Sequence, residues 1–210
     1  MAGTIAGSTV GLAKLASIIG VKVLDASGSG ATSSIIAGIN WVVSDAQSKG
    51  RIGHAIANMS LGGSYSASLN NAVASAVSSG IPFTVAAGNS NANAANFSPA
   101  STSSAITVGA TDRTDVRAYY SNFGANLDIF APGSSITSAW IGSDSGTNTI
   151  SGTSMASPHV CGLAAYLMAY EGLTSPSEVV NRIIELSTTG VVINPGSESP
   201  NRLIYNGSAQ

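Results

Sequence analysis

The chain has 210 residues, of which 44% are hydrophobic and 9% charged, and its formal net charge is −2. This length suits one domain with a sizeable core, and the composition excludes a disordered chain, which would carry more charge and fewer apolar residues. The small negative charge gives no reason to expect nucleic acid or an anionic membrane as a partner, and no apolar run reaches the roughly 18 residues of a membrane span.

Apolar runs alternate along the chain with longer segments of helical periodicity, a pattern typical of a parallel sheet with helices on both faces. We predict strands at residues 20–24, 57–61, 83–87, 105–110 and 127–130, and helices at residues 33–48, 66–79, 154–170 and 177–187. The fold class is therefore α/β. No repeat, linker or domain boundary interrupts the pattern, so residues 1–210 are expected to form a single domain.

Three glycine-containing turns follow predicted strands, at residues 25–30, 62–64 and 88–91. The carboxyl ends of parallel strands form the ligand-binding edge of an open sheet, so these turns are compatible with an extended ligand lying close to the backbone. For any one of these turns alone, a simple tight turn is the stronger interpretation.

Residues 151–159 read Ser-Gly-Thr-Ser-Met-Ala-Ser-Pro-His and lead into an almost wholly apolar predicted helix. The hydroxyl of Ser154 is expected at the helix N-terminus, where the macrodipole favours developing negative charge. Pro158 is expected near the helix start, where a missing N–H costs least. For an arbitrary serine in this setting a helix cap would be the better interpretation, but nine residues in this order make that interpretation a poor one here.

This segment resembles the nucleophile segment of the subtilisin-like serine proteases, and specifically their fungal proteinase K-like branch. The resemblance covers essentially the whole chain, through segments at residues 2–7, 23–25, 60–63, 86–89, 128–133 and 200–205. It implies a three-layer α/β/α sandwich with a mainly parallel central sheet. It also implies a secreted serine endopeptidase acting on polypeptide substrates, expected to be a monomer with no membrane or nucleic-acid partner.

The family builds its triad in the order Asp, His, Ser, and the resemblance places the triad His one residue before Met1. We therefore expect the chain to be the C-terminal portion of the catalytic domain, without the triad Asp and His and without the N-terminal elements of the sheet. A missing strand would leave apolar edges that favour aggregation. In subtilisin, itself a member of this family, losing the nucleophile or the base costs about 10⁶ in turnover, so the isolated chain is expected to be nearly inactive. No signal peptide is visible.

The resemblance assigns catalytic roles to two residues. Ser154 would attack the peptide bond and form an acyl-enzyme, and the side-chain amide of Asn89 would bind the oxyanion together with the Ser154 N–H. As an alternative, Asn89 fits a left-handed turn position after Gly88.

The resemblance also implies an extended peptide-binding cleft with an edge segment, two walls of the primary specificity pocket and a rim. The edge segment is Gly28, Ser29 and Gly30. One pocket wall is Ser60, Leu61, Gly62 and Gly63, the other is Ala86, Ala87 and Gly88, and Gly152 lies near the rim. The pocket walls carry no acidic residue, which predicts apolar or aromatic side chains before the cleaved bond rather than Lys or Arg.

No cofactor is expected for catalysis, but a structural calcium ion is. By resemblance, the carboxylate of Asp128 would bind it with the backbone carbonyls of Ser103 and Ala105, and such oxygen ligands suit a hard cation. The family segment usually has Pro at position 103, where this chain has Ser. The alternative for Asp128 is a surface residue that ends a strand.

Neither histidine of the chain replaces the missing base, because His159 is expected to point into packing and His54 to be exposed or structural. His54, Asp112 or Asp128, and Ser154 follow the chain order of a chymotrypsin-like triad, but that fold is an all-β barrel and the helical patterns contradict it. An α/β-hydrolase is excluded as well, because residues 152–156 lack the second glycine of the G-x-S-x-G motif. The sequence is also compatible with a non-catalytic peptide-binding or antigenic fragment, with a truncated gene product, and with a chain that receives its base from a second chain.

Overall fold

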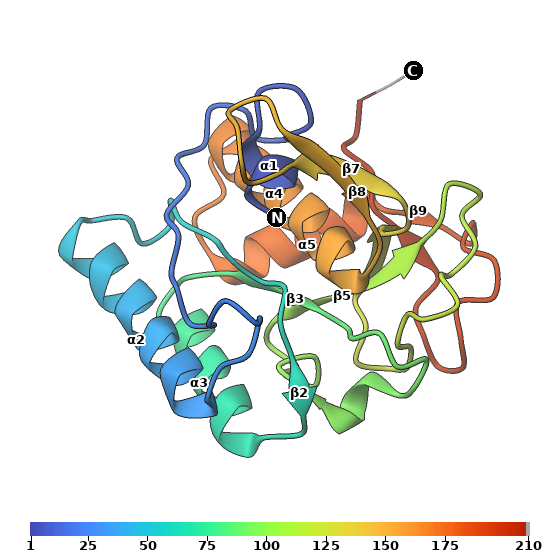
Figure 1. The fold of residues 1–210 in the computed structure, drawn as a ribbon, viewed down its shortest axis with the longest axis horizontal. Helices are drawn as coiled ribbons and strands as arrows, with labels where there is room; N and C mark the ends of the chain where they lie inside the picture. The colour runs from blue at the N-terminus through green and yellow to red at the C-terminus, as the bar shows by residue number, and fades with distance from the viewer. Residues whose placement is uncertain (209–210) are drawn as a thin grey trace.

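A six-stranded sheet forms the middle of the molecule in a computed structural model that describes residues 1–208 (Figure 1). The strands lie in the order β1 (Ala57–Met59), β3 (Phe83–Ala86), β5 (Ile106–Thr111), β6 (Ile129–Pro132), β10 (Arg202–Leu203) and β9 (Thr188–Thr189). The first five run parallel to one another, and β9 is antiparallel to β10. The prediction of a mainly parallel sheet is confirmed.

Helices cover both faces of the sheet, as the sandwich requires (Figure 1). α2 (Thr32–Ser48) and α3 (Ala67–Ser78) lie side by side and share a core with β1 and β3. α4 (Thr153–Glu171) and α5 (Pro176–Leu186) share a second core with β5 and β6, and α1 (Ala2–Ala6) packs on α4. Within residues 1–208 no helix has both the length and the apolar character needed to cross a bilayer.

Successive side chains of β3 point alternately to the two faces of the sheet and so contribute to different layers. Phe83 and Val85 belong to the α2/α3 core, whereas the buried Thr84 between them donates to Asn58 Oδ1, which also accepts from Ser157 of α4. Successive side chains of a strand point to opposite faces, so one four-residue strand serves both layers.

Several short elements are not predicted from the sequence. They are the short helix α1, the strands β10 and β9 of the central sheet, the 3₁₀ helix η1 (Ala94–Asn96), and two antiparallel pairs. The pairs are β2 (Gly63–Ser64) with β4 (Phe97–Ser98) and β7 (Ile136–Ala139) with β8 (Thr147–Ile150). β7 and β8 are largely exposed and polar, so they lack the continuous apolar run that identifies the buried strands.

The strand predicted at residues 20–24 is wrong, because the structure forms no strand there. Val21 and Val23 instead pack over Gly38 of α2, where an added Cβ would lie 2.4 Å from Val23 Cγ1. A strand exists only when a neighbour shares its backbone hydrogen bonds, and within residues 1–208 β1 pairs only with β3. The apolar pattern of this segment is explained by packing on a helix.

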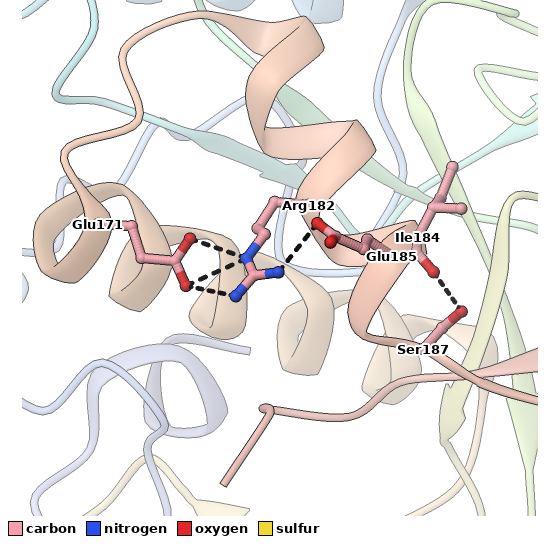
Figure 2. Close-up of polar contacts among 5 residues, drawn as sticks. All are labelled: Glu171, Arg182, Ile184, Glu185 and Ser187. Carbon is pink, nitrogen blue, oxygen red and sulfur yellow. Dashed lines mark hydrogen bonds and ion pairs between the residues drawn. The ribbon is translucent and has the colours of Figure 1, made fainter.

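Helix α5 is fixed at its start and along its side. Ser175 and Glu178 form a capping box at its N-terminus. Figure 2 shows Arg182 of α5 between two carboxylates, with Nε 2.8 Å from Glu171 Oε2 at the end of α4 and Nη1 2.9 Å from Glu185 Oε2. The contact between Arg182 and Glu171 joins α5 to the C-terminal end of the helix whose N-terminus carries Ser154.

Candidate active site

Ser154 lies at the N-terminus of α4, where the carboxyl ends of the parallel strands meet. The helix begins at Thr153, and Gly152 N donates to Gly133 O at 2.9 Å, which fixes the turn before it. Ser154 is half-buried, and among the described residues its N–H has no hydrogen-bond acceptor. A free N–H at a helix N-terminus favours a negatively charged oxygen.

Pro158 lies inside α4 and not in its first turn, which corrects the prediction from the sequence. In a regular helix the N–H of residue 158 would donate to the carbonyl of Ser154, but proline has none. The Ser60 hydroxyl donates to that carbonyl instead, at 2.8 Å. Ser60 therefore satisfies the acceptor that Pro158 leaves free, and it joins the loop after β1 to the candidate nucleophile.

The Asn89 side chain has an unambiguous orientation. Its Oδ1 accepts from the backbone N–H of Thr153 at 2.9 Å and from the Thr153 hydroxyl at 2.8 Å. A backbone N–H can only donate, so the atom facing Thr153 must be the amide oxygen. Thr153 is fully buried, and its hydroxyl also accepts from Gly88 N at 3.1 Å. The amide nitrogen of Asn89 is thereby turned away from Thr153.

Two nitrogen atoms that carry N–H groups lie close to one point beside Gly152. A Cβ added at Gly152 would lie 3.5 Å from Asn89 Nδ2 and 3.6 Å from Ser154 N. Both nitrogens therefore border one small space, next to the exposed Asn89 and the half-buried Ser154. Two N–H groups that border one space can donate to an oxygen that gains negative charge there.

A cleft of about 410 Å³ opens from this point. Its lining includes the predicted catalytic residues Ser154 and Asn89 and most of the predicted specificity pocket: Leu61, Gly62, Gly63, Ala86, Ala87 and Gly88, with Phe97, Ser98 and Ala100 in addition. The predicted wall residue Ser60 and the predicted rim residue Gly152 are not part of this lining. None of the lining side chains is charged. A volume of this order is within the range of ligand-binding clefts.

A second cleft of about 320 Å³ shares Leu61, Gly62 and Gly63 with the first. It includes Gly30 but neither Gly28 nor Ser29. Those two residues lie in an exposed turn that is closed by hydrogen bonds from Ser27 N and Ser29 N to Asp25 Oδ1. The structure thus brings one of the three predicted edge residues to the cleft.

Neither histidine serves as a base for Ser154 within residues 1–208. Nδ1 of His159 lies 2.9 Å from Met155 O on the same helix, and burial lowers the pKa of its imidazole. The exposed His54 follows Gly53, which packs against Thr174 beyond the far end of α4. At 1.5 Å per residue, that end is about 25 Å from Ser154. The Ser154 hydroxyl itself lies 3.5 Å from the Ser60 carbonyl.

Asp128 lies at the other end of the sheet, next to the start of β5. Its Oδ2 accepts from Thr107 N at 2.7 Å, whereas Oδ1 has no hydrogen-bond donor among the described residues. Burial raises the pKa of this carboxyl group to about 6. Ala105 directly precedes β5 and is buried, and Ser103 is exposed in the turn before it. The described residues contain no cluster of three or more His, Cys, Asp or Glu side chains able to bind a metal.

Two roles were not predicted from the sequence. They are the orientation of the Asn89 amide by Thr153 and the hydrogen bond from the Ser60 hydroxyl to the Ser154 carbonyl. Thr153 precedes the candidate nucleophile, but nothing in the sequence indicates that its hydroxyl orients an amide 64 residues away. The contact of Ser60 could have been anticipated in part, because Pro158 has no N–H and leaves the carbonyl of Ser154 without its donor in the helix.

Comparison with known proteins identifies the family of this chain. The model of the family described as "Subtilase family" matches residues 1–202. The chain is 57% identical over 208 residues to "Subtilisin-like serine protease AsES" of Sarocladium strictum, covering 99% of this chain and 53% of that protein. It is 55% identical to "Alkaline protease 1" of Aspergillus clavatus, covering 100% of this chain and 51% of that protein. The chain therefore spans about half the length of these curated relatives.

A solved structure supports the fold as well. The crystal structure of a cold adapted subtilisin-like serine proteinase superposes with a TM-score of 0.92 at 45% identity, covering 99% of this chain and 73% of that one. This similarity confirms the expected sandwich architecture.

Proposed function

The chain belongs to the subtilase family, and on that basis we propose that it carries the nucleophile, the oxyanion-binding groups and the specificity cleft of a serine endopeptidase. Ser154 Oγ would attack the carbonyl carbon of a peptide bond. The oxygen that becomes negative would accept from Asn89 Nδ2 and Ser154 N–H. By likeness to fungal alkaline proteases, we propose that the protein acts on polypeptides outside the cell.

The observation that carries this proposal is that Asn89 Nδ2 and Ser154 N lie within 3.6 Å of one point beside Gly152, and that both residues line the cleft. Attack also requires a base within hydrogen-bond reach of the Ser154 hydroxyl. Because neither histidine of the chain is placed for this role, residues 1–208 by themselves are expected to turn over substrate very slowly. Peptide binding depends on the cleft alone and does not require the base.

Peptide selectivity tests the cleft separately from the chemistry. A succinyl-Ala-Ala-Pro-Phe peptide acid should bind the purified protein more tightly than its Arg counterpart, by at least roughly tenfold, because an uncharged pocket cannot pair a buried guanidinium. Calorimetric titration would measure both affinities. Tighter binding of the Arg peptide would contradict the proposed substrate class.

The nucleophile is tested by Ser154→Ala. Any hydrolysis of the matching Phe p-nitroanilide above the rate in buffer should disappear in this variant, whereas peptide-acid binding should persist. Hydrolysis that survives the substitution would show that Ser154 is not the nucleophile.

We also propose that Asp128 takes part in a structural calcium site, with the carbonyls of Ser103 and Ala105. The donor set fits a hard cation, because Oδ1 of a largely buried carboxylate lacks a hydrogen-bond donor among the described residues. The neighbouring hydroxyl of Thr102 is likewise buried without a partner there. Both oxygens lie near the turn that precedes β5.

Asp128 predicts a stability change with pH in calcium-free buffer. Its folded pKa of about 6 lies above the ordinary value of 3.8, so the folded state binds this proton more tightly than the unfolded state. The stabilisation from this proton is fully present below pH 3.8 and is lost as the pH rises through 6, a loss of about 3 kcal/mol. Urea unfolding at pH 4 and at pH 7 would measure it.

Asp128→Asn is the control, because it removes the titrating group. This variant should lose less stability than the wild type between pH 4 and pH 7. Adding calcium at pH 7 should stabilise the wild type and not the variant. An equal response of both proteins to calcium would refute the proposed site.

A further inference from the structure

The backbone of the loop that carries Asn89 is hydrogen-bonded at several points to one residue, Asn122. Asn122 Nδ2 donates to Ala87 O at 2.8 Å, and its Oδ1 accepts from Ser90 N at 2.9 Å and Ala92 N at 3.1 Å. Its own N–H donates to Gly88 O at 2.9 Å. Four hydrogen bonds therefore attach one residue to the backbone on both sides of Asn89.

This contact is close and buried. Asn122 is 0% exposed. A Cβ at Gly88 would lie only 2.4 Å from Asn122 Nδ2, so a glycine at position 88 is what lets the loop approach. Gly88 also has φ of +102°, a conformation that residues with a Cβ rarely adopt. The path of the loop is thus shaped around the Asn122 side chain.

Asn122 is itself anchored to the sheet. The buried Ser121 hydroxyl accepts from Ala110 N of β5 at 3.0 Å and donates to Asn122 O at 3.0 Å. Ala118 N donates to Ala110 O at 2.8 Å. A continuous set of hydrogen bonds therefore runs from the central strand β5 through Ser121 and Asn122 to the Asn89 loop.

We propose that Asn122 is a positioning residue for the oxyanion site, an inference that rests on the function proposed above. Thr153 fixes the rotation of the Asn89 amide about its own side chain, and Asn122 fixes the backbone from which that side chain projects. Asn122 touches no substrate. It acts by keeping Asn89 Nδ2 at the space that Ser154 N also borders, since a donor displaced by even about 1 Å loses much of its effect.

The test compares two ligands that differ only at the oxyanion site. Succinyl-Ala-Ala-Pro-Phe with a free carboxylate places a charged oxygen there, and the same peptide as its carboxamide does not. Calorimetric titration at about pH 8, where the carboxylate is fully ionised, would measure both affinities. The affinity of the carboxylate divided by that of the carboxamide reports how strongly the oxyanion site binds a charged oxygen. General loosening of the protein would weaken both peptides and leave the ratio unchanged.

We expect Asn122→Leu to lower this ratio roughly tenfold, towards the value of Asn89→Leu. The double variant should lose no more than Asn89→Leu alone, because Asn122 acts through Asn89. Asn201→Leu is the matched control. Asn201 also bridges a backbone N–H and carbonyl, both of Val192 at 2.8 Å, but in a segment that lines neither cleft. It should keep the wild-type ratio.

If Asn122→Leu does not fold, Asn122→Asp tests the positioning role instead. At about pH 5 a buried, protonated carboxyl group can still donate to Ala87 O, so this variant should regain most of the ratio that it loses at about pH 8. A wild-type ratio in Asn122→Leu, or an Asn122→Asp ratio below wild type that does not change with pH, would overturn the positioning role. If Asn89→Leu leaves the ratio unchanged, the oxyanion role of Asn89 fails, and the inference fails with it.

Discussion

Asn89→Leu is expected to lower Ser154-dependent turnover by about 10²–10³, with little change in KM. That magnitude is the one known for the oxyanion-site asparagine of subtilisin, and it is carried over to this chain by family likeness. The physical reason is that Asn89 Nδ2 borders the space where the oxyanion forms but donates to no described group in the free protein. Its hydrogen bond would therefore be gained chiefly in the transition state.

The measurement is kcat and KM on the Phe p-nitroanilide, each rate corrected by the rate of Ser154→Ala. Where turnover is too slow, the rate of Ser154 phosphonylation by a fluorophosphonate probe reports the same site. Asn70→Leu is a suitable control, because Asn70 lies on α3 and donates to Ser101. A loss that falls on KM alone would indicate that Asn89 binds substrate and transition state equally, against the proposed role.

Gly88→Ala is expected to destabilise the protein by about 3 kcal/mol. About 1–2 kcal/mol arises from forcing a residue with a Cβ into a left-handed conformation. The remainder arises because the new methyl group would lie 2.4 Å from Asn122 Nδ2, in a buried region. Urea unfolding at constant pH would measure the difference.

Gly50→Ala separates these two causes. Gly50 also has a positive φ, of +61°, but no atom lies within 4 Å of its added Cβ, so only the backbone cost should appear. Combining Gly88→Ala with Asn122→Ala should recover part of the loss by removing the clash. Equal destabilisation by the two glycine variants would show that Asn122 is not the obstacle.

Strands β1, β3, β5 and β6 of the central sheet could be predicted because each lies in a continuous apolar run, whereas the two-residue strands β10 and β9 could not. β3 and β5 are wholly buried and lie within one or two residues of their predicted bounds. Residues 20–24 have the same apolar character yet form no strand, since an apolar run packs equally well on a helix. The polar pair β7 and β8 gives no such signal.

The amino-acid sequence by itself determined the parallel α/β class, the nine-residue segment around Ser154 and the Ala-Ala-Gly-Asn segment that ends at Asn89. It determined these because hydrophobic period and local motif are properties of neighbouring residues. Only the tertiary structure decided which atom of Asn89 faces Thr153, which hydroxyl satisfies the carbonyl left free by Pro158, and which residue underlies the Asn89 loop. These hydrogen bonds join residues 35 to 94 positions apart, so they depend on how strands and loops pack together and cannot be read from local sequence.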